Sequence, residues 1–371
     1  VWIMAYTTID DPSEYFHTRL YSGTGSALSI TNNANAGNFK PDWIWLKSRN
    51  NATNHNVFDS SRGQTKRLYP NLSDAEDTVS GFTLDTNGFS TGTSSVGDIN
   101  VSGKTYVAWQ WKCNGGTTTT NDASATSVGT IDSVYQANTT AGFSIVTYTG
   151  TGSAGTIAHG LGVVPSWYVV KRRSATEGWT LYHHKNTSAP ETDHLLLEST
   201  AATVDQADIW NDTSPTSSVF SLGNNSATNA SSSTYVAYCF SEVKGYSKFG
   251  SYTGNGNADG PFLYLGFRPK FIIIKRTDTT GSWFLIDSVR DINTLGAANT
   301  KGSAEAQHQQ LFADASDAEA TYNSSAGDFL SNGYKLKGTN ASTNASGGTF
   351  IYMAFAEHPF VSSKGVPTTA R

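Results

Sequence analysis

Two acid-and-arginine groups are the first candidates for chemistry in this chain of 371 residues. They are Asp59-Ser60-Ser61-Arg62 and Asp287-Ser288-Val289-Arg290. A serine nucleophile needs a base within hydrogen-bond reach, and the only nearby histidine, His55, accompanies the first group alone. The recurrence therefore favours an Asp–Arg pair that holds a loop, and does not favour a nucleophilic site.

A pair of carboxylates is the second chemical possibility, because glycosidases use two acids at a defined separation. The acids that recur at matching places are Asp59, Glu76, Asp287 and Glu319. They are the residues to test for a polysaccharide depolymerase. We expect no enzymatic activity, since no cofactor motif and no catalytic set accompanies them.

Metal binding and sugar stacking are the remaining possibilities. His183, His184 and His194 lack the partner pair that a zinc site requires, so a surface loop is the preferred interpretation, and no metal or cofactor is expected. Core packing is the preferred interpretation of most tryptophans. Trp210, in the polar stretch Ile209-Trp210-Asn211-Asp212, is expected to be exposed and is the one speculative ligand-binding residue.

The sequence pattern of the elements that must position these residues occurs three times along the chain. Each copy opens on a Tyr-x-Gly-x-Gly phrase, continues to a proline with an apolar run ending in lysine, and closes on an Asn-x-Ser-x-x-Thr-aromatic phrase before an apolar strand. No helix pattern follows the glycines, so they indicate a turn that ends a strand and not a phosphate loop. The opening tyrosines, the lysines and the closing asparagines are Tyr21, Tyr148, Tyr252, Lys47, Lys171, Lys275, Asn100, Asn229 and Asn344.

Short apolar runs predict strands throughout the chain. Phe143–Tyr148 alternates with period two, whereas Val169–Lys171 and Phe271–Ile274 are continuous runs typical of strands covered on both faces. Charged residues are only 15%, and the Ser, Thr, Asn and Gly that replace them disfavour long helices. A short helix is plausible at Ser73–Asp77, where Ser73 and Glu76 would form a capping box. The predicted fold is all-β, with three tandem antiparallel β-sandwich or jelly-roll-like modules of about 100 residues.

The repeat sets the predicted domain boundaries. Cys113 and Cys239 fall at different offsets in their copies, so they are expected to be unpaired, partly buried thiols. Almost no linker separates the second and third copies, which are therefore expected to pack against each other or to share a stiff joint. The predicted segments are an N-terminal arm at 1–14, β-module one at 15–112, a Ser/Thr/Gly-rich linker at 113–140, β-module two at 141–246, β-module three at 247–360 and a C-terminal tail at 361–371.

Composition excludes several classes of partner. The net charge is −5 and no basic stripe occurs, so nucleic-acid binding is not expected. No apolar run approaches the length of a membrane span, and no secretory segment is recognised at the start. Met4 looks like a natural initiation residue, which would make Val1 to Ile3 upstream residues or the product of an alternative initiation.

Several phrases resemble a module of tail-fibre-like and other structural proteins of marine bacteriophages (cyanophage- or pelagiphage-like). They include Gly142–Arg173, Asn211–Ser218, Thr234–Phe240, Phe355–Phe360 and the N-terminal Tyr6–Phe16. The resemblance covers nearly the whole chain. Copy three departs most, because it lacks the His-Gly-Leu-Gly phrase of copy two.

The resemblance implies a non-enzymatic virion structural protein, on a tail fibre, an appendage or a capsid-surface fibre, and supplies no catalytic residues. It places the protein on the surface of the viral particle with other virion proteins as partners. A homo-oligomer is expected, with a trimer favoured because closed symmetry is the default for assemblies. A host-surface glycan is a candidate contact. The alternative is a secreted or virion-borne carbohydrate-binding module.

Overall fold

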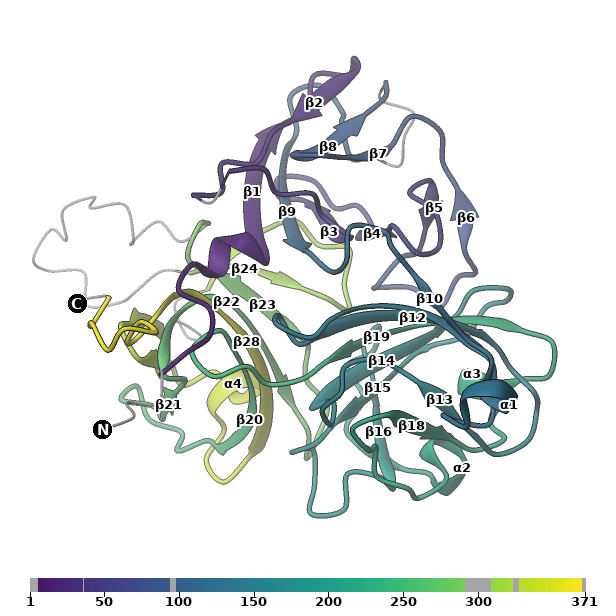
Figure 1. Ribbon diagram of the computed structural model, residues 1–371. Coiled ribbons are helices and arrows are strands. Elements are labelled where there is room, and N and C mark those ends of the chain that lie inside the picture. The colour runs from purple at the N-terminus through teal and green to yellow at the C-terminus, as the bar shows by residue number, and fades with distance from the viewer. Residues whose placement is uncertain (1–5, 36, 94–97, 291–307, 323–326, 369–371) are drawn as a thin grey trace, which may run out of the picture.

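The computed structural model describes residues 6–35, 37–93, 98–290, 308–322 and 327–368 (Figure 1). They form an all-β protein with several antiparallel sheets, which confirms the predicted fold class. Helical elements in these residues are single turns. They are η1 (Pro12–Glu14), α1 (Ala123–Thr126), α2 (Ala207–Trp210), α3 (Ser226–Asn229) and α4 (Ala341–Asn344).

Copy one, residues 15–112, contributes one four-stranded sheet and two smaller sheets. The main sheet, called sheet 1, has the order β1-β9-β3-β4, the second sheet has the order β2-β8-β7, and β5 pairs with β6. The strands are β1 (Phe16–Ser22), β2 (Leu28–Ile30), β3 (Trp43–Ser48), β4 (Asn56–Asp59), β5 (Lys66–Arg67), β6 (Asp77–Thr78), β7 (Thr83–Asp85), β8 (Gly88–Thr91) and β9 (Thr105–Trp111).

Copy two, residues 141–246, belongs to an eight-stranded sheet, called sheet 2, with the order β10-β11-β12-β19-β14-β15-β16-β17. A separate pair of strands, β13 and β18, lies on the face of sheet 2 that points away from the centre of the molecule (Figure 1). The strands are β10 (Thr119–Asn121), β11 (Ser133–Asn138), β12 (Phe143–Thr149), β13 (Gly155–Ala158), β14 (Trp167–Arg172), β15 (Trp179–His183), β16 (Asp193–Leu196), β17 (Val204–Asp205), β18 (Val219–Leu222) and β19 (Thr234–Phe240).

Copy three, residues 247–360, forms a six-stranded sheet, called sheet 3, with the order β20-β28-β22-β23-β24-β25, and a small sheet with the order β21-β27-β26. The strands are β20 (Ser247–Thr253), β21 (Phe262–Tyr264), β22 (Phe267–Arg276), β23 (Phe284–Asp287), β24 (His308–Phe312), β25 (Ala320–Tyr322), β26 (Gly327–Leu330), β27 (Gly333–Leu336) and β28 (Thr349–Pro359).

The same four-strand order recurs in the three main sheets. In each sheet the last strand of the copy lies between its first strand and the strand that carries the repeat lysine. The orders are β1-β9-β3, β12-β19-β14 and β20-β28-β22. The opening tyrosine stacks on the aromatic residue of the closing phrase in every copy. The ring centroids are 4.9 Å apart for Tyr21 and Tyr106, and 5.1 Å apart for Tyr148 and Tyr235.

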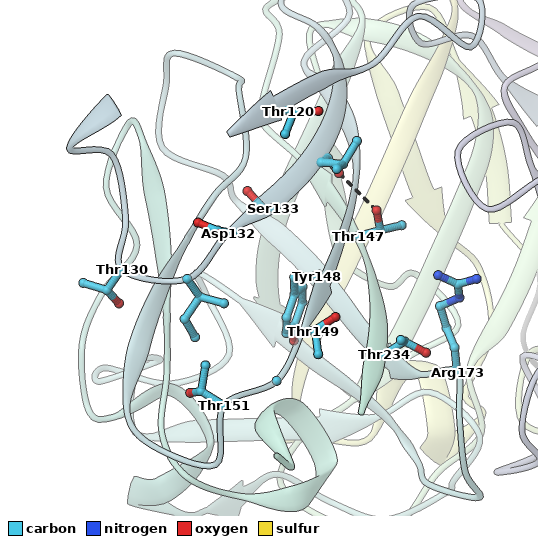
Figure 2. Close-up of a pocket in the computed structure, with 13 residues that line it drawn as sticks. Thr120, Thr130, Asp132, Ser133, Thr147, Tyr148, Thr149, Thr151, Arg173 and Thr234 are labelled. Carbon is cyan, nitrogen blue, oxygen red and sulfur yellow. Dashed lines mark hydrogen bonds between the residues drawn. The ribbon is translucent and has the colours of Figure 1, made fainter. Parts of the chain in front are cut away.

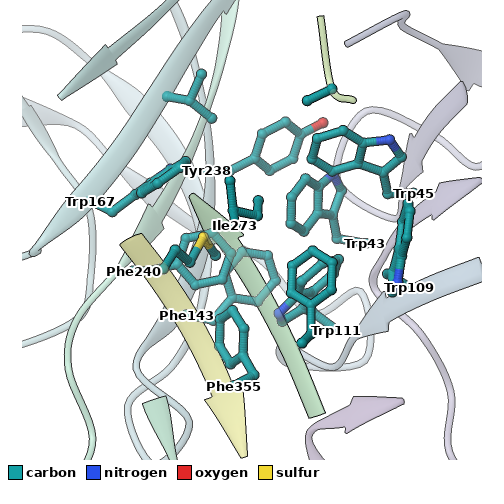
Figure 3. Close-up of a cluster of buried hydrophobic side chains, with 14 of the residues drawn as sticks. Trp43, Trp45, Trp109, Trp111, Phe143, Trp167, Tyr238, Phe240, Ile273 and Phe355 are labelled. Carbon is teal, nitrogen blue, oxygen red and sulfur yellow. The ribbon is translucent and has the colours of Figure 1, made fainter. Parts of the chain in front are cut away.

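The three main sheets share one central aromatic core (Figure 3). Along β19, Val236, Tyr238 and Phe240 face this common core, while the residues between them face a separate cluster under β13 and β18. Because side chains alternate across a strand, an apolar run without polar interruption serves both clusters at once. The prediction of strands covered on both faces is confirmed: Phe271 lies in the common core and Ile272 in the outer cluster of copy three.

Residues 113–140, predicted as a linker, are part of sheet 2. β11 pairs with β12 over six residues, and β10 pairs with β11. The Thr-rich composition suggested a loop, but threonine is also a good strand residue when it has a partner edge. The helix predicted at Ser73–Asp77 is also absent, because Glu76 binds arginines and does not cap a helix.

Both chain ends of the described structure lie against copy three. The Tyr6 hydroxyl donates to the backbone oxygen of Gly266 at 2.9 Å, and Ile9 is buried in the common core. In the tail, the backbone N–H of Ser363 donates to Asp10 at 2.6 Å. The N-terminal arm therefore spans from copy three to β1 of copy one (Figure 1).

Candidate functional site

Trp210 lies inside the protein, so the prediction that it is an exposed sugar platform is wrong. The residue is 0% exposed. Its indole N–H donates to the backbone oxygen of Asp193 at 3.0 Å, and its ring packs edge-on against Tyr168 with centroids 4.8 Å apart. The helical turn α2 directs Trp210 inward, while the polar Asn211 and Asp212 after it take up left-handed conformations and stay exposed.

The first acid-and-arginine group forms a buried junction between copies one and two. Arg62 Nε contacts Asp59 at 2.5 Å and Arg62 Nη1 contacts Glu76 at 2.8 Å, with the side chains of Arg62 and Asp59 fully buried. Copy two completes the junction. The Tyr238 hydroxyl donates to Asp59 at 2.6 Å, and Arg173 binds Glu76 at 2.8 Å.

The second group forms the same kind of junction between copies three and one. Arg290 Nε contacts Asp287 at 2.5 Å and Arg290 Nη1 contacts Glu319 at 3.0 Å. Here copy one completes the junction. The Trp109 indole N–H donates to Asp287 at 3.0 Å, and Arg49 binds Glu319 at 2.7 Å. The recurrent acids and arginines therefore bridge sheets.

The charges in these junctions compensate one another. Burial alone would lower the pKa of Arg62, but Asp59 and Glu76 raise it overall. Burial alone would raise the pKa of Glu76, but the guanidinium groups of Arg173 and Arg62 outweigh that effect and lower it. A carboxylate held ionised by two arginines suits a bridging role better than that of a general acid.

Between copies two and three, a neutral histidine replaces the aspartate. His183 pairs with Trp167 in the register in which the two aspartates pair with Trp43 and Phe271. Its Nδ1 accepts a backbone N–H, so Nε2 carries the proton and donates to the Tyr352 oxygen at 3.2 Å. Burial lowers the pKa of His183 to about 3. Because His183 lies in β15 and is 1% exposed, the surface loop expected for this histidine from the sequence is wrong.

The facing residues of this third junction have changed with it. Met353 occupies the β28 position that corresponds to the hydrogen-bond donors of β9 and β19. Thr277 stands where the other copies have their bridging arginine, and its backbone oxygen accepts from Thr203 at 3.0 Å. The two junction glutamates make the same backbone contact with their arginines, at 2.9 and 2.6 Å. The contacts thus form a closed ring of copy one on two, two on three and three on one.

The repeat lysines, which end the apolar run of each copy, are buried. Lys47, Lys171 and Lys275 are 0% exposed. Their ammonium groups donate to backbone oxygens, including Ser73 of copy one for Lys171 at 3.2 Å and Thr200 of copy two for Lys275 at 2.9 Å. Burial lowers the pKa of each lysine to about 8. Backbone carbonyls, and not carboxylates, are their direct partners.

We expect these lysines to make stability rise with pH from about 8 to about 10.5. In that window the unfolded lysine binds more protons than the folded one, so the free energy of unfolding increases with pH. The advantage of the wild type over Lys47→Met should therefore grow by up to about 1.4 kcal/mol per pH unit. Urea titrations at two pH values in this window measure it. Lys364→Met, at an exposed position, is the control, and a constant gap for Lys47→Met would contradict the prediction.

The closing asparagines fix the Tyr-x-Gly-x-Gly turns. Asn100, Asn229 and Asn344 are each 0% exposed. The backbone N–H of Thr24 donates to the Asn100 side chain at 2.9 Å, and that of Thr151 donates to Asn229 at 2.8 Å. Although these asparagines match a glycosylation sequence, the folded protein gives them an internal structural role.

A threonine-lined depression of about 650 Å³ lies on copy two (Figure 2). Asp132 and Arg173 add one carboxylate and one guanidinium to its rim. Thr147 donates to the Val134 oxygen at 3.3 Å, while Thr149 is exposed. Tyr148 contributes little to the wall, since it is 5% exposed and stacks inward. These groups can hydrogen-bond a hydroxyl-rich ligand but provide no stacking platform.

Cys113 and Cys239 are free and buried, as predicted for their pairing state. Within the described ranges, no cluster of three or more His, Cys, Asp or Glu side chains is placed to hold a metal ion. Nor do the described residues contain a helix long and apolar enough to cross a membrane.

Comparison with known proteins identifies a family without a known activity. A model described as a domain of unknown function (DUF7483) matches residues 11–359. The match covers nearly the whole chain, so the chain belongs to this family. No curated protein matches the sequence.

Proposed function

We propose that this member of the family is a non-enzymatic structural protein of a bacteriophage virion, part of a tail fibre, an appendage or the capsid surface. The observation that carries the proposal is the use of the recurrent charged groups. Asp59, Arg62, Asp287 and Arg290 join neighbouring sheets around one core and are fully buried. Charged side chains that are buried in contacts between sheets hold the sheets together. The resemblance of the sequence phrases to phage structural proteins supports the same proposal.

The proposed partners are other virion proteins and further copies of the chain. A homotrimer is the favoured assembly, because identical subunits commonly close into cyclic rings. The low charge and the hydroxyl-rich composition suit a body exposed to solvent. Contact with a host surface is part of the proposal for the tail position.

The test is to purify particles from the source and search them for this protein. Mass spectrometry should detect the chain in proportion to the major virion proteins, and cryo-electron microscopy should show density that fits the three-sheet body. Density at the tail periphery would support a fibre, and density on the head would support a capsid-surface protein. Particles that lack the chain would refute the virion role.

Carbohydrate binding is the second candidate function. The threonine-lined depression is the surface that favours it. A glycan array should then show binding by the whole protein that Thr149→Val weakens, because this exposed hydroxyl lies in the depression. Ser29→Val, at an exposed position in copy one, is the matched control. Absence of binding by the wild type would remove this candidate. Trp210 has no part in it, since it is buried.

A further inference from the structure

In copy two, the segment 128–138 covers the outer edge of both layers. Its second half, β11, pairs antiparallel with β12 of the main sheet. Its first half lies on the small sheet, where Ile131 forms a parallel bridge with Ile157. The N–H groups of Thr130 and Ile131 donate to the Thr156 oxygen at 3.0 and 3.2 Å. One extended segment therefore satisfies two sheet edges.

Copy three has the same two edges, and no described segment of the chain covers them in this way. β20 and β21 are the end strands of their sheets and lie at the outer margin of the molecule (Figure 1). Residues 241–246 are the whole connection between β19 and β20, whereas residues 112–142 connect β9 to β12. The short connection leaves no chain to form a counterpart of β11.

The backbone register shows which groups of β20 face outward. The N–H of Gly254 donates to the backbone oxygen of Gly348, which directly precedes β28. In an antiparallel pair every second residue bonds to the partner strand, so the backbone groups of residues 252, 250 and 248 also point toward β28. Ser251 and Thr253 consequently direct their N–H and C=O groups away from the sheet. The Phe249 oxygen, also directed outward, accepts from His184 of copy two at 3.0 Å. The free edge thus continues directly from the contact between copies two and three.

The outward groups of β21 are bordered by aromatic rings. Leu336 N–H donates to the Pro261 oxygen, which places the backbone groups of Phe262 and Tyr264 on the outer side. Leu263 pairs with the first aromatic residue of β27 as Ile157 pairs with that of β18, so Phe262 corresponds to Thr156. Phe262 and Tyr264 are 42% and 53% exposed.

Copy one shows what an edge without a partner looks like in this protein. Its counterpart of β21 is β2, whose exposed residue is Ser29, with Thr31 exposed just after the strand. Small polar side chains on an edge strand stabilise an added strand little, whereas exposed aromatic rings stabilise it strongly through cross-strand side-chain contacts. The aromatic pair therefore marks the edge of copy three as a contact surface.

We infer that the edge formed by β20 and β21 accepts an extended segment of a partner protein chain. The segment runs antiparallel to β20 and bridges β21 in parallel, as 128–138 does in copy two, and donates backbone N–H groups to the Phe262 oxygen. It places an apolar side chain against Phe262 and Tyr264. Strand addition of this kind combines main-chain hydrogen bonds with side-chain contacts. The inference holds wherever the protein resides and so goes beyond the proposed function.

A synthetic peptide with the sequence of residues 126–139 is the probe, because this segment covers the equivalent edges in copy two. Hydrogen exchange of the whole protein, read by mass spectrometry with and without the peptide, should show fast exchange at Ser251, Thr253, Phe262 and Tyr264 that slows when the peptide binds. Fluorescence anisotropy of the labelled peptide gives the affinity.

Tyr264→Lys should weaken peptide binding by about tenfold, the equivalent of one or two backbone hydrogen bonds, because an edge lysine opposes strand addition. Ser29→Lys in β2 is the matched control and should leave binding unchanged. Three results would overturn the inference: no binding; slow exchange in the free monomer, which means the chain's own N-terminal segment occupies the edge; or protection that rises with protein concentration alone, which means a second copy does.

Discussion

Arg62→Met is expected to lower the free energy of unfolding by about 3–5 kcal/mol, the usual cost of removing one partner of a buried ion pair. Asp59 is fully buried and Glu76 nearly so, and Arg62 contacts both. In the variant Asp59 keeps the Tyr238 hydroxyl and the backbone N–H groups of residues 61 and 62, and Glu76 keeps Arg173. The buried Asp59 carboxylate then has hydrogen bonds but no cation beside it, and this unpaired buried charge is what makes the effect large.

Equilibrium denaturation in urea measures this loss, with Arg276→Met as the control. Arg276 pairs with Asp278 at the surface, where the carboxylate side chain is 36% exposed, and such pairs contribute about 0–1 kcal/mol. The deficit of Arg62→Met should also shrink as the pH falls below the ordinary glutamate pKa of 4.5, because Arg62 helps to lower the pKa of Glu76 and that stabilisation is lost when Glu76 is protonated. Equal, small losses in the two variants would show that the junction adds nothing to stability.

The all-β fold and the repeated strands could be predicted from the sequence because both depend on local pattern. The apolar run Phe271–Ile274 predicted a strand covered on both faces, as β22 is. Alternation in Phe143–Tyr148 predicted a strand but not its burial, because β12 is also covered on both faces. The free thiols followed from their unequal offsets in the copies. In contrast, the Thr-rich segment 113–140 has loop composition, and only the presence of β12 beside it makes it a strand.

The junctions could not be predicted from single motifs, because each combines two copies. The sequence shows that the phrase Ser-Asp-Ala-Glu, present at 73–76 and 316–319, is missing from copy two. It also shows that Thr277 stands in copy three where copies one and two have an arginine. These two losses look unrelated until the ring order is known. The loop of copy two lies on copy three, so both changes fall in one junction. Met353 and His183 follow the same logic.

Trp210 illustrates why exposure is the hardest property to infer. Its neighbours Asn211 and Asp212 are polar and exposed, yet a single helical turn is enough to direct one side chain inward. A tryptophan buries a large apolar area and needs one acceptor for its N–H. The Asp193 backbone oxygen supplies that acceptor. Local polarity therefore says little about one large aromatic residue.

Trp43→Ala is expected to destabilise all three sheets together by about 3–5 kcal/mol, the range for truncating a large core aromatic. Trp43 is 4% exposed and lies in the common core, with its ring centroid 4.4 Å from that of Trp111 and 4.8 Å from that of Tyr238 (Figure 3). The last contact joins copies one and two. Since the cavity opens where the sheets meet, the loss should not remain within copy one.

Hydrogen exchange during a urea titration distinguishes a shared loss from a local one. Strands β9, β19 and β28 should lose protection at one lowered midpoint in Trp43→Ala, since each contributes side chains to the common core. Phe262→Ala, at a position 42% exposed, should change the midpoint little, as surface substitutions do. If β9 lost protection while β28 kept its wild-type midpoint, the sheets would be independent folding units and the shared core would not couple them.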